Sequence, residues 1–572
     1  MRRFAIAFVL VACAARAGAD DKTPPVHFDC GGHSYGPTVW RATADGKTLV
    51  TLGDENSIRV WDAATGKLAR TLWLPPAAGG KNTGPKLWLA PDGKRAAVPY
   101  HTPEEPRGKL ALIPLDDSGT YRVIGGEPFE VTEVAFSANG KLVATTAGRP
   151  SVNVWDAATG KRAAVLNFDP DLRATGFAFS PDGKKVAIGL PMVNFNELKR
   201  SVIAIYEAET GKWESQFAYP RDGFPRPEWS PDGKLLLAAN NGFAFDVFTT
   251  KGERKVQFDW KPGGRLVAAG FDTAGRCVSV AHTDTGLRVR DELAGRGLFE
   301  VRDDTAGAWR AAVLAGGTVL LRTNPYRVGF RLLDAGTGKE LSRVSAHSFT
   351  RFSGLAWAKT GSVLAWADSD RPYDNADVKP GAALDLAALA PPAKVPEVRS
   401  RALEWGNVTL KQGDYSASTT VMGKPVKLAY EAEYDFETIV HGTLVGQKHA
   451  VLACTTGLFG YDAETGAQTT NYKPFTHAYK VSPSPDGRHF AAAAHLHPVI
   501  SVFRVGVPDP VLFVAPRGAE WVAWTPTGAW FSSEGGTKLA GKLEERAPGK
   551  LPTFVPFDPK LKDADKVKAA VR

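Results

Sequence analysis

Cysteine and methionine are scarce in this chain, whose 572 residues include four cysteines and three methionines. No two cysteines have the C-x-x-C spacing, which argues against a zinc ribbon or a thioredoxin-like redox motif. Cys277 and Cys454 lie in apolar, strand-like segments, so we expect buried thiols there. Cys30 remains a candidate for a disulfide bridge.

Long hydrophobic runs are also absent after the first 20 residues. The run at 4–15, FAIAFVLVACAA, follows Arg2 and Arg3 and precedes a small-x-small site at 17–19. It is shorter than the roughly 20 residues of a spanning helix. We therefore expect residues 1–19 to be a signal peptide and the protein to be exported, to the periplasm or outside the cell. Alternatively, 10–13 (LVAC) is a lipoprotein box, in which case a lipid on Cys13 anchors the protein to a membrane.

The chain has no strong excess of positive charge. Its formal charge is +9, and without residues 1–19, which hold three arginines and no acid, it would be +6. Many lysines occupy separate turn-like segments, as at Lys47, Lys94 and Lys141, where they favour solubility. The sequence therefore predicts no nucleic-acid partner.

A repeat dominates what is present. The octapeptide VWDAATGK occurs at 60–67 and at 154–161, and Asp-Gly or Asn-Gly dipeptides recur at 45–46, 92–93, 139–140 and 182–183. Asn-Gly and Asp-Gly favour tight hairpin turns, and a period of about 40–45 residues is typical of propeller blades with four strands each. We therefore expect an all-β fold of tandem β-propellers, built from four-stranded antiparallel blades and about twelve repeats.

The repeat resembles the WD-repeat (WD40-like) family, in the type found among exported bacterial proteins. Two literal matches carry the resemblance, with structural positions at Trp61, Asp62, Gly66, Trp155, Asp156 and Gly160. The family often stabilises blades through a set of His, Ser or Thr, Asp and Trp side chains. Here Glu55 and Arg149 stand where the Asp of that set would be.

The length exceeds one seven-bladed ring, so the sequence predicts two propellers, at 20–345 and 346–572. The Ala/Pro-rich run at 379–397 offers an alternative boundary near 380–400. The polar tail at 560–572, KLKDADKVKAAVR, is expected to be a solvated or frayed end.

Residues with catalytic or metal-binding potential are few. His495 and His497 would alternate along a strand and could share a zinc ion, but no third ligand is evident nearby. We therefore predict no catalytic residue, no cofactor and no metal site.

Three units lengthen the repeat, at 99–109, 190–200 and 369–381. Long loops on a rigid scaffold often carry binding, and these hold residue types suited to interfaces. The candidate partner-binding residues are Tyr100, His101, Phe195, Asn196, Arg371 and Tyr373. Alternatively, the insertions are tolerated surface variation, because a longer loop costs little entropy.

The resemblance implies an exported, non-enzymatic scaffold for protein–protein interaction in the cell envelope, with protein partners. The alternative is a propeller enzyme, or a protein that binds a small ligand or metal in the axial channel.

Overall fold

The computed structural model describes residues 27–28, most of 37–395 and most of 411–572. The longer stretches outside it are 1–26, 29–36, 79–85, 103–107, 260–265, 303–309, 323–328, 346–351, 369–381, 396–410 and 429–438. The chain forms two compact units. The ring unit comprises Gly36–His347 and Glu545–Thr553, and the C-terminal unit comprises Met1–Tyr35, Ser348–Glu544 and Phe554–Arg572. The predicted boundary between two propellers stays a prediction.

The ring unit is built from four-stranded antiparallel sheets, which we call blades 1 to 7 in chain order. Blade 1 holds β2 (Pro37–Ala42), β3 (Thr48–Gly53), β4 (Ser57–Asp62) and β5 (Leu68–Trp73), and blade 2 holds β6 (Trp88–Leu89), β7 (Arg95–Tyr100), β8 (Lys109–Pro114) and β9 (Arg122–Gly125). Blade 3 holds β10 (Glu133–Phe136), β11 (Leu142–Thr146), β12 (Ser151–Asp156) and β13 (Arg162–Asn167), and blade 4 holds β14 (Gly176–Phe179), β15 (Lys185–Leu190), β18 (Val202–Glu207) and β19 (Trp213–Ala218).

The remaining blades repeat this pattern. Blade 5 holds β20 (Pro225–Trp229), β21 (Leu235–Asn240), β22 (Ala244–Thr249) and β23 (Arg254–Asp259), and blade 6 holds β24 (Leu266–Phe271), β25 (Cys277–Thr283), β26 (Gly286–Asp291) and β27 (Arg296–Arg302). Blade 7 holds β28 (Arg310–Leu314), β29 (Thr318–Arg322), β30 (Gly329–Asp334) and β31 (Glu340–Ser345). A small hairpin, β16 (Val193–Asn194) with β17 (Glu197–Leu198), extends the connection between β15 and β18.

The hairpin turns follow the predicted dipeptides. Gly46, Gly93, Gly140 and Gly183 all adopt φ between +67° and +73°, a conformation in which a Cβ would be strained. The predicted turns are therefore confirmed. They join the first strand of each blade to its second, as between Phe136 and Leu142 of blade 3.

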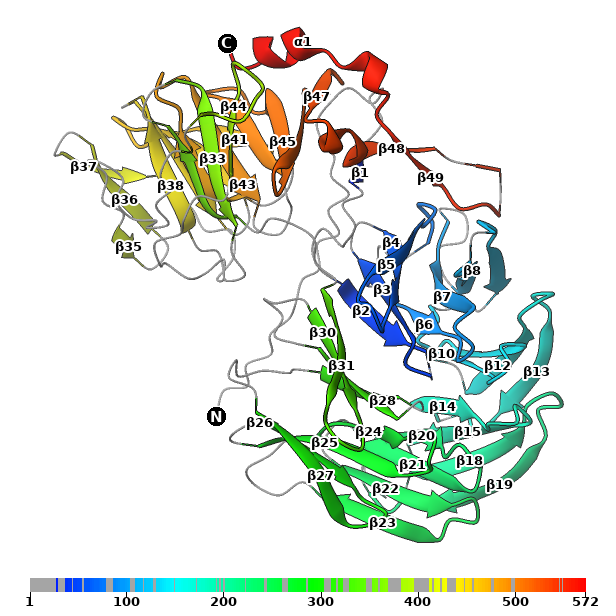
Figure 1. Cartoon of the computed structure of the whole chain (residues 1–572). Coiled ribbons are helices and arrows are strands. Elements are labelled where there is room, and N and C mark those ends of the chain that lie inside the picture. The colour runs from blue at the N-terminus through cyan, green and yellow to red at the C-terminus, as the bar shows by residue number, and fades with distance from the viewer. Residues whose placement is uncertain are drawn as a thin grey trace. The chain divides into compact units, whose positions relative to one another are not determined.

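Blade 1 packs against blade 7, which closes the ring. Trp40, Leu49 and Trp61 of blade 1 share a buried cluster with Phe330 and Leu332 of blade 7. Apart from the β16–β17 hairpin, the four strands of each described blade follow one another in the chain. No described blade therefore takes a strand from the far end of the unit, and side-chain packing between blades 1 and 7 closes the ring. The first strands of the blades lie around the centre of the ring, and fourth strands such as β13, β19 and β23 lie outside (Figure 1).

Antiparallel strands alternate in direction, so the ring has two different faces. The turns between first and second strands and between third and fourth strands emerge on one side, which we call the turn face. The connections between second and third strands, and those from one blade to the next, emerge on the other side, the loop face. Both segments 99–109 and 190–200 belong to the loop face.

The C-terminal unit contains sheets of unequal size. Its sheets are β32 (Phe352–Trp357), β33 (Val363–Asp368) and β34 (Ala382–Asp385); β35 (Lys411–Gly413), β36 (Ser416–Val421) and β37 (Lys424–Leu428); and β38 (Ile439–Val445), β39 (His449–Cys454), β40 (Leu458–Asp462) and β41 (Gln468–Tyr472). A six-stranded sheet holds β42 (Ala478–Pro483), β43 (His489–Ala494), β44 (Ile500–Arg504), β45 (Leu512–Arg517), β46 (Glu520–Trp524) and β47 (Trp530–Ser532). The last sheet joins β1 (His27–Phe28), β48 (Ala540–Glu544) and β49 (Thr553–Pro556), and the helices are η1 (Gly535–Lys538), η2 (Pro559–Leu561) and α1 (Ala564–Ala569).

The C-terminal tail is ordered, so the expectation of a frayed end is wrong. Asp563 caps α1 by accepting a hydrogen bond from the backbone of Lys566. Val567 is fully buried in the core formed by β32–β34 and the six-stranded sheet. The ammonium of Lys562 also lies 5.7 Å from the centre of the Trp530 ring, where a cation is attracted to the face of the aromatic ring.

The all-β fold class of propeller-like, four-stranded antiparallel sheets is confirmed. In the C-terminal unit, the last two repeats form one six-stranded sheet instead of separate blades: β42–β45 belong to the first of them and β46–β47 to the second. The two parts are continuous because β45 pairs with β46.

Candidate functional site

The Asp and Gly of the repeat shape the turns of the turn face. The hydroxyl of Thr65 donates to Asp62 Oδ1 at 2.8 Å, and the Thr65 backbone N–H donates to the same oxygen at 2.7 Å. These hydrogen bonds lower the pKa of the Asp62 carboxyl, because they stabilise its charged form. Asp156 makes the same pair of bonds with Thr159.

The Gly of the repeat has a second role between blades. Gly66 adopts φ +69°, and a Cβ on it would lie 2.3 Å from the carbonyl oxygen of Arg343 in blade 7. Gly160 adopts φ +73° and stands next to Ile124 and Val123 of blade 2. The turn of one blade therefore packs against the outer strand of the blade before it.

The Trp of the repeat is a buried hydrogen-bond donor. Trp61 Nε1 donates to Thr51 Oγ1 at 2.8 Å, and Trp155 Nε1 donates to Thr145 Oγ1 at 2.8 Å. In both blades the two residues lie on neighbouring strands. The Thr–Trp half of the set that the family resemblance implies is thus present twice.

Replacing Thr51 by valine should cost about 1–3 kcal/mol of the free energy of unfolding, because the buried Trp61 Nε1 loses its acceptor. Denaturant unfolding followed by tryptophan fluorescence measures the loss. Thr273→Val is the control, since Thr273 is an exposed turn residue. Equal effects of the two substitutions would contradict the role of the Thr51 hydroxyl.

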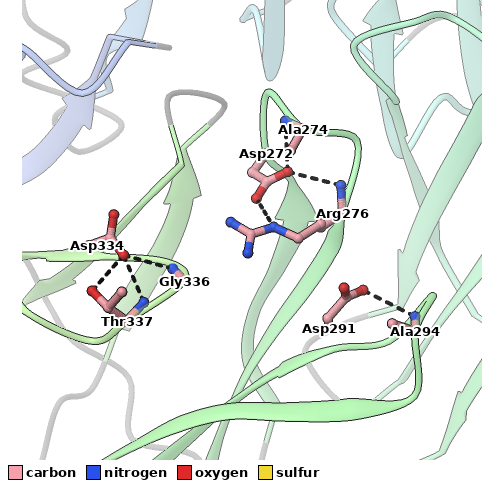
Figure 2. A network of polar contacts seen from close by, with 8 residues as sticks. All are labelled: Asp272, Ala274, Arg276, Asp291, Ala294, Asp334, Gly336 and Thr337. Atoms are coloured by element: carbon pink, nitrogen blue, oxygen red, sulfur yellow. Dashed lines mark hydrogen bonds and ion pairs between the residues drawn. The ribbon is translucent and has the colours of Figure 1, made fainter.

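Turns of blades 6 and 7 form a polar network on the turn face. Figure 2 shows Asp272 accepting from the Arg276 side chain, at 2.6 Å from its Nε, and from the backbone of Ala274 and Arg276. In blade 7, the Asp334 carboxylate accepts hydrogen bonds from the backbone and the hydroxyl of Thr337. The bonds from Thr337 and Gly336 lower the pKa of the Asp334 carboxyl, and the positive charge of Arg276 lowers it further. Because each of these groups has a partner within the turns, the network is a stabilising one.

Two of the six predicted partner-binding residues lie in the described part of the chain. Tyr100 is half-buried against the core between blades 1 and 2, and its ring centre lies 6.1 Å from that of Tyr121. The backbone N–H of His101 donates to Ala77 at 2.7 Å. Both ring nitrogens of His101 are buried, and no residue of the described part of the chain is their hydrogen-bond partner. Phe195, Asn196, Arg371 and Tyr373 lie outside the described residues, as do His495 and His497. Partner binding by the six residues stays a prediction.

An exposed aromatic side chain stands on the loop face between blades 4 and 5. Phe224 is 44% exposed, yet its backbone N–H donates to the side chain of Asn240 at 3.2 Å. The preceding residue, Gly223, accepts from the Ser201 hydroxyl at 3.0 Å, and Pro225 accepts from the Thr175 hydroxyl at 2.8 Å. Hydrogen bonds from blades 4 and 5 and from the connection into blade 4 therefore position an apolar ring in solvent.

Charged side chains lie beside Phe224 around the axis of the ring. In β20 the residues alternate, so that Arg226 and Glu228 are exposed while Pro225, Pro227 and Trp229 are buried. The Arg226 guanidinium lies 3.1 Å from the carboxylate of Glu133, which begins β10 of blade 3. We call Glu133, Arg226 and Glu228 the axial cluster.

Blade 4 lies between the two partners of this ion pair. A Cβ on Gly176, the first residue of β14, would lie 3.0 Å from Cγ and 3.2 Å from Cβ of Arg226. Gly176 does not have a left-handed φ, so the need for a glycine there is one of space. Its missing side chain lets Arg226 extend across blade 4 to blade 3.

Glu228 lies deeper along the same strand. Its Oε1 accepts a hydrogen bond from the backbone of Phe271 in blade 6 at 3.3 Å. The side chain is exposed at the protein surface, yet neighbouring protein atoms remove part of the hydration of its carboxyl. The resulting loss of hydration raises the pKa of the Glu228 carboxyl to about 7, and the bond from Phe271 opposes this only in part.

Glu228 should make the stability of the ring unit depend on pH. Below about pH 4.5 the carboxyl is protonated in both the folded and the unfolded chain. Between 4.5 and 7 the folded state retains a proton that the unfolded state loses, so stability falls as the pH rises. Relative to Glu228→Gln, the free energy of unfolding of the natural protein should therefore fall across this window and level off above it. Denaturant titrations at several pH values measure the difference, and a constant difference would contradict the shifted pKa.

Sequence reasoning missed both Phe224 and the axial cluster. The alternation of proline and charged residues in PRPE at 225–228 was the available signal for two charges on one side of a strand. Nothing near Glu133 in the sequence indicated that Arg226 would be its partner.

Cys277 and Cys454 are both buried, which confirms the prediction of buried thiols. Within the described ranges, no group of three or more His, Cys, Asp or Glu side chains could hold a metal ion. No helix in the same residues is long and apolar enough to cross a membrane.

Comparison with known proteins connects this fold to WD-repeat proteins. The chain is 23% identical over 238 residues to Protein hir1 of Schizosaccharomyces pombe, covering 37% of this chain and 25% of that protein. It is 26% identical over 152 residues to WD repeat-containing protein SL1-17 of Schistosoma mansoni, covering 26% of this chain and 46% of that protein. The chain thus spans less than half the length of each relative. No protein-family model matches it.

The resemblance to WD-repeat propellers is confirmed by these relatives together with the four-stranded sheets. The second relative is named for its repeat, so the comparison bears on the fold.

Proposed function

We propose that this protein is an exported, non-enzymatic interaction scaffold that binds a protein partner at the loop face between blades 4 and 5. The observation that carries the proposal is the exposed ring of Phe224 on a backbone held by Asn240, Ser201 and Thr175. A side chain positioned in advance loses little entropy on binding.

The charge of Arg226, close to Phe224 in the chain, indicates what kind of partner this surface would bind. The side chain of Arg226 is 61% exposed and Glu133 is its partner on one side. Aromatic and arginine side chains are enriched among residues that dominate binding energy at interfaces. A partner with an apolar residue for Phe224 and a carboxylate for Arg226 suits the surface best.

A photo-crosslinking amino acid at position 224 tests the proposal in the producing cells. We expect one discrete adduct that excess natural protein suppresses and that Arg226→Glu weakens. The same amino acid at position 213 is the control, because Trp213 is 52% exposed on the outer strand β19. No adduct at 224, or the same adducts from both positions, would argue against the site.

A small ligand on the axis is the second candidate function, and the axial cluster favours it. The high pKa of the Glu228 carboxyl suits proton exchange with a ligand near neutral pH. A metal or small molecule that copurifies with the natural protein and is lost from Glu228→Gln would support this candidate over the scaffold.

Export is part of the proposal and rests on the pattern of residues 1–19. Mass spectrometry of the mature protein should find an N-terminus at Asp20. A lipid-modified Cys13 and recovery with membranes would support the anchored alternative.

A further inference from the structure

A short segment near the end of the chain belongs to the ring unit although its neighbours do not. Residues 545–553 follow β48 and lead into β49, and these two strands pair within the C-terminal unit. We call residues 549–553 the strap. The strap is thus the tip of a hairpin whose two strands are part of another sheet.

The strap adds to the edge of blade 2 as an extended peptide. The backbone N–H of Tyr121 donates to Gly549 at 2.8 Å, and the N–H of Leu551 donates to Gly119 at 2.7 Å. Between them, Thr120 and Lys550 form an antiparallel bridge. The bonds run in both directions, as in the addition of a strand to a sheet edge.

One side chain of the strap enters the ring. Leu551 is 4% exposed and packs in the core between blades 1 and 2, with Leu72, Leu115 and Tyr121. Lys550, which precedes it, is exposed. Alternate residues of an extended segment point to opposite sides, so Leu551 supplies an apolar anchor while Lys550 faces solvent.

The contact is small compared with those that join the blades. The described contacts of the strap with blade 2 are two backbone hydrogen bonds, the bridge at Lys550 and the burial of Leu551. Gly549 supplies the left-handed residue, at φ +80°, that turns the chain into the slot. An attachment of this size opens far more readily than global unfolding occurs.

We propose that Gly119–Tyr121 and the Leu551 slot form a peptide-binding site, and that the strap is its resident, detachable ligand. The site takes an extended segment with glycine at one position and leucine two residues later. This proposal does not depend on the partner surface at Phe224, which belongs to other blades.

The full-length variant Leu551→Asp tests the site, because a carboxylate cannot enter the apolar slot. A fluorescent peptide of residues 546–554 should bind this variant at least about tenfold more tightly than it binds the natural protein, whose slot is occupied. The same peptide with aspartate for the leucine should not bind. Absence of peptide binding to the variant, or equal binding to both proteins, would overturn the proposal.

Hydrogen exchange of the unmodified protein provides a second measurement, should Leu551→Asp fail to fold. The amides of Tyr121 and Leu551 should exchange together and at least about a hundredfold faster than amides in the β7–β8 ladder of the same blade. Equal protection of the two groups would show a permanently attached segment and would overturn the proposal.

Discussion

Replacing Gly189 by alanine should lower the free energy of unfolding of the ring unit by about 3 kcal/mol or more. The added Cβ would stand 1.8 Å from the carbonyl oxygen and 2.8 Å from the carbonyl carbon of Pro225. Both are backbone atoms, and Thr175 donates to the carbonyl oxygens of Gly189 and Pro225. The new atom must therefore separate blade 4 from blade 5. Guanidinium unfolding, followed by tryptophan fluorescence, measures the loss.

Gly297→Ala is the matched control. Gly297 also lies in a strand, lacks a left-handed φ and has open space where a Cβ would be. Its replacement should change stability by less than about 1 kcal/mol, with a small gain expected from the less flexible unfolded chain. Similar losses of stability from both substitutions would mean that the close approach of Pro225 is not the reason why position 189 requires glycine.

Replacing Asp246 by alanine should cost about 3–5 kcal/mol, because it leaves the Arg221 guanidinium in the protein without its counter-charge. Asp246 is fully buried in β22, and the Arg221 side chain is 16% exposed. Arg221 donates to both carboxylate oxygens and to the backbone of Phe258. Arg254 lies 3.9 Å from the same carboxylate. Thermal and denaturant unfolding measure the effect.

An exposed ion pair in the neighbouring blade is the control that distinguishes the effect of burial from the effect of charge alone. Lys185 and Glu214 have side chains 42% and 38% exposed, so Glu214→Ala should cost less than about 1 kcal/mol. Added salt should reduce the effect of Glu214→Ala and leave that of Asp246→Ala nearly unchanged. Comparable losses at low salt would show that the Arg221–Asp246 pair contributes no more than a surface pair.

Local features of the fold could be predicted from the sequence. The dipeptides at 45–46 and 139–140 determine hairpin turns through their own backbone preferences, and both glycines have the expected conformation. The repeat at 60–67 likewise determines a turn within eight residues. Such signals need no knowledge of distant segments.

Contacts between blades could not be predicted in this way. The need for glycine at 189 arises from Pro225, and Arg226 finds Glu133 only because Gly176 leaves space. Asp246 lies within the otherwise apolar strand segment AFDVF at 244–248, and its partner Arg221 lies 25 residues earlier, before the first strand of the blade. These pairs depend on how successive blades are rotated, which no single repeat contains.

The C-terminal tail contains a helical pattern of apolar residues that its charged composition made hard to recognise. Its many charges suggested a solvated end, yet Ala564, Val567 and Val571 follow helical spacing and all pack on the core. At the candidate site, Phe224 lies outside the three lengthened segments at 99–109, 190–200 and 369–381. Loop length alone therefore did not identify the exposed aromatic ring.

The pairing of distant segments has a consequence for synthesis on the ribosome. All seven blades are made before residues 545–553 emerge, and His27 must wait for Gly541, its partner in the sheet. A polypeptide that stops early would have an unfilled seam between blades 1 and 2 and a first strand without a neighbour. Proteases act on such openings, so the late segments distinguish finished molecules from truncated ones.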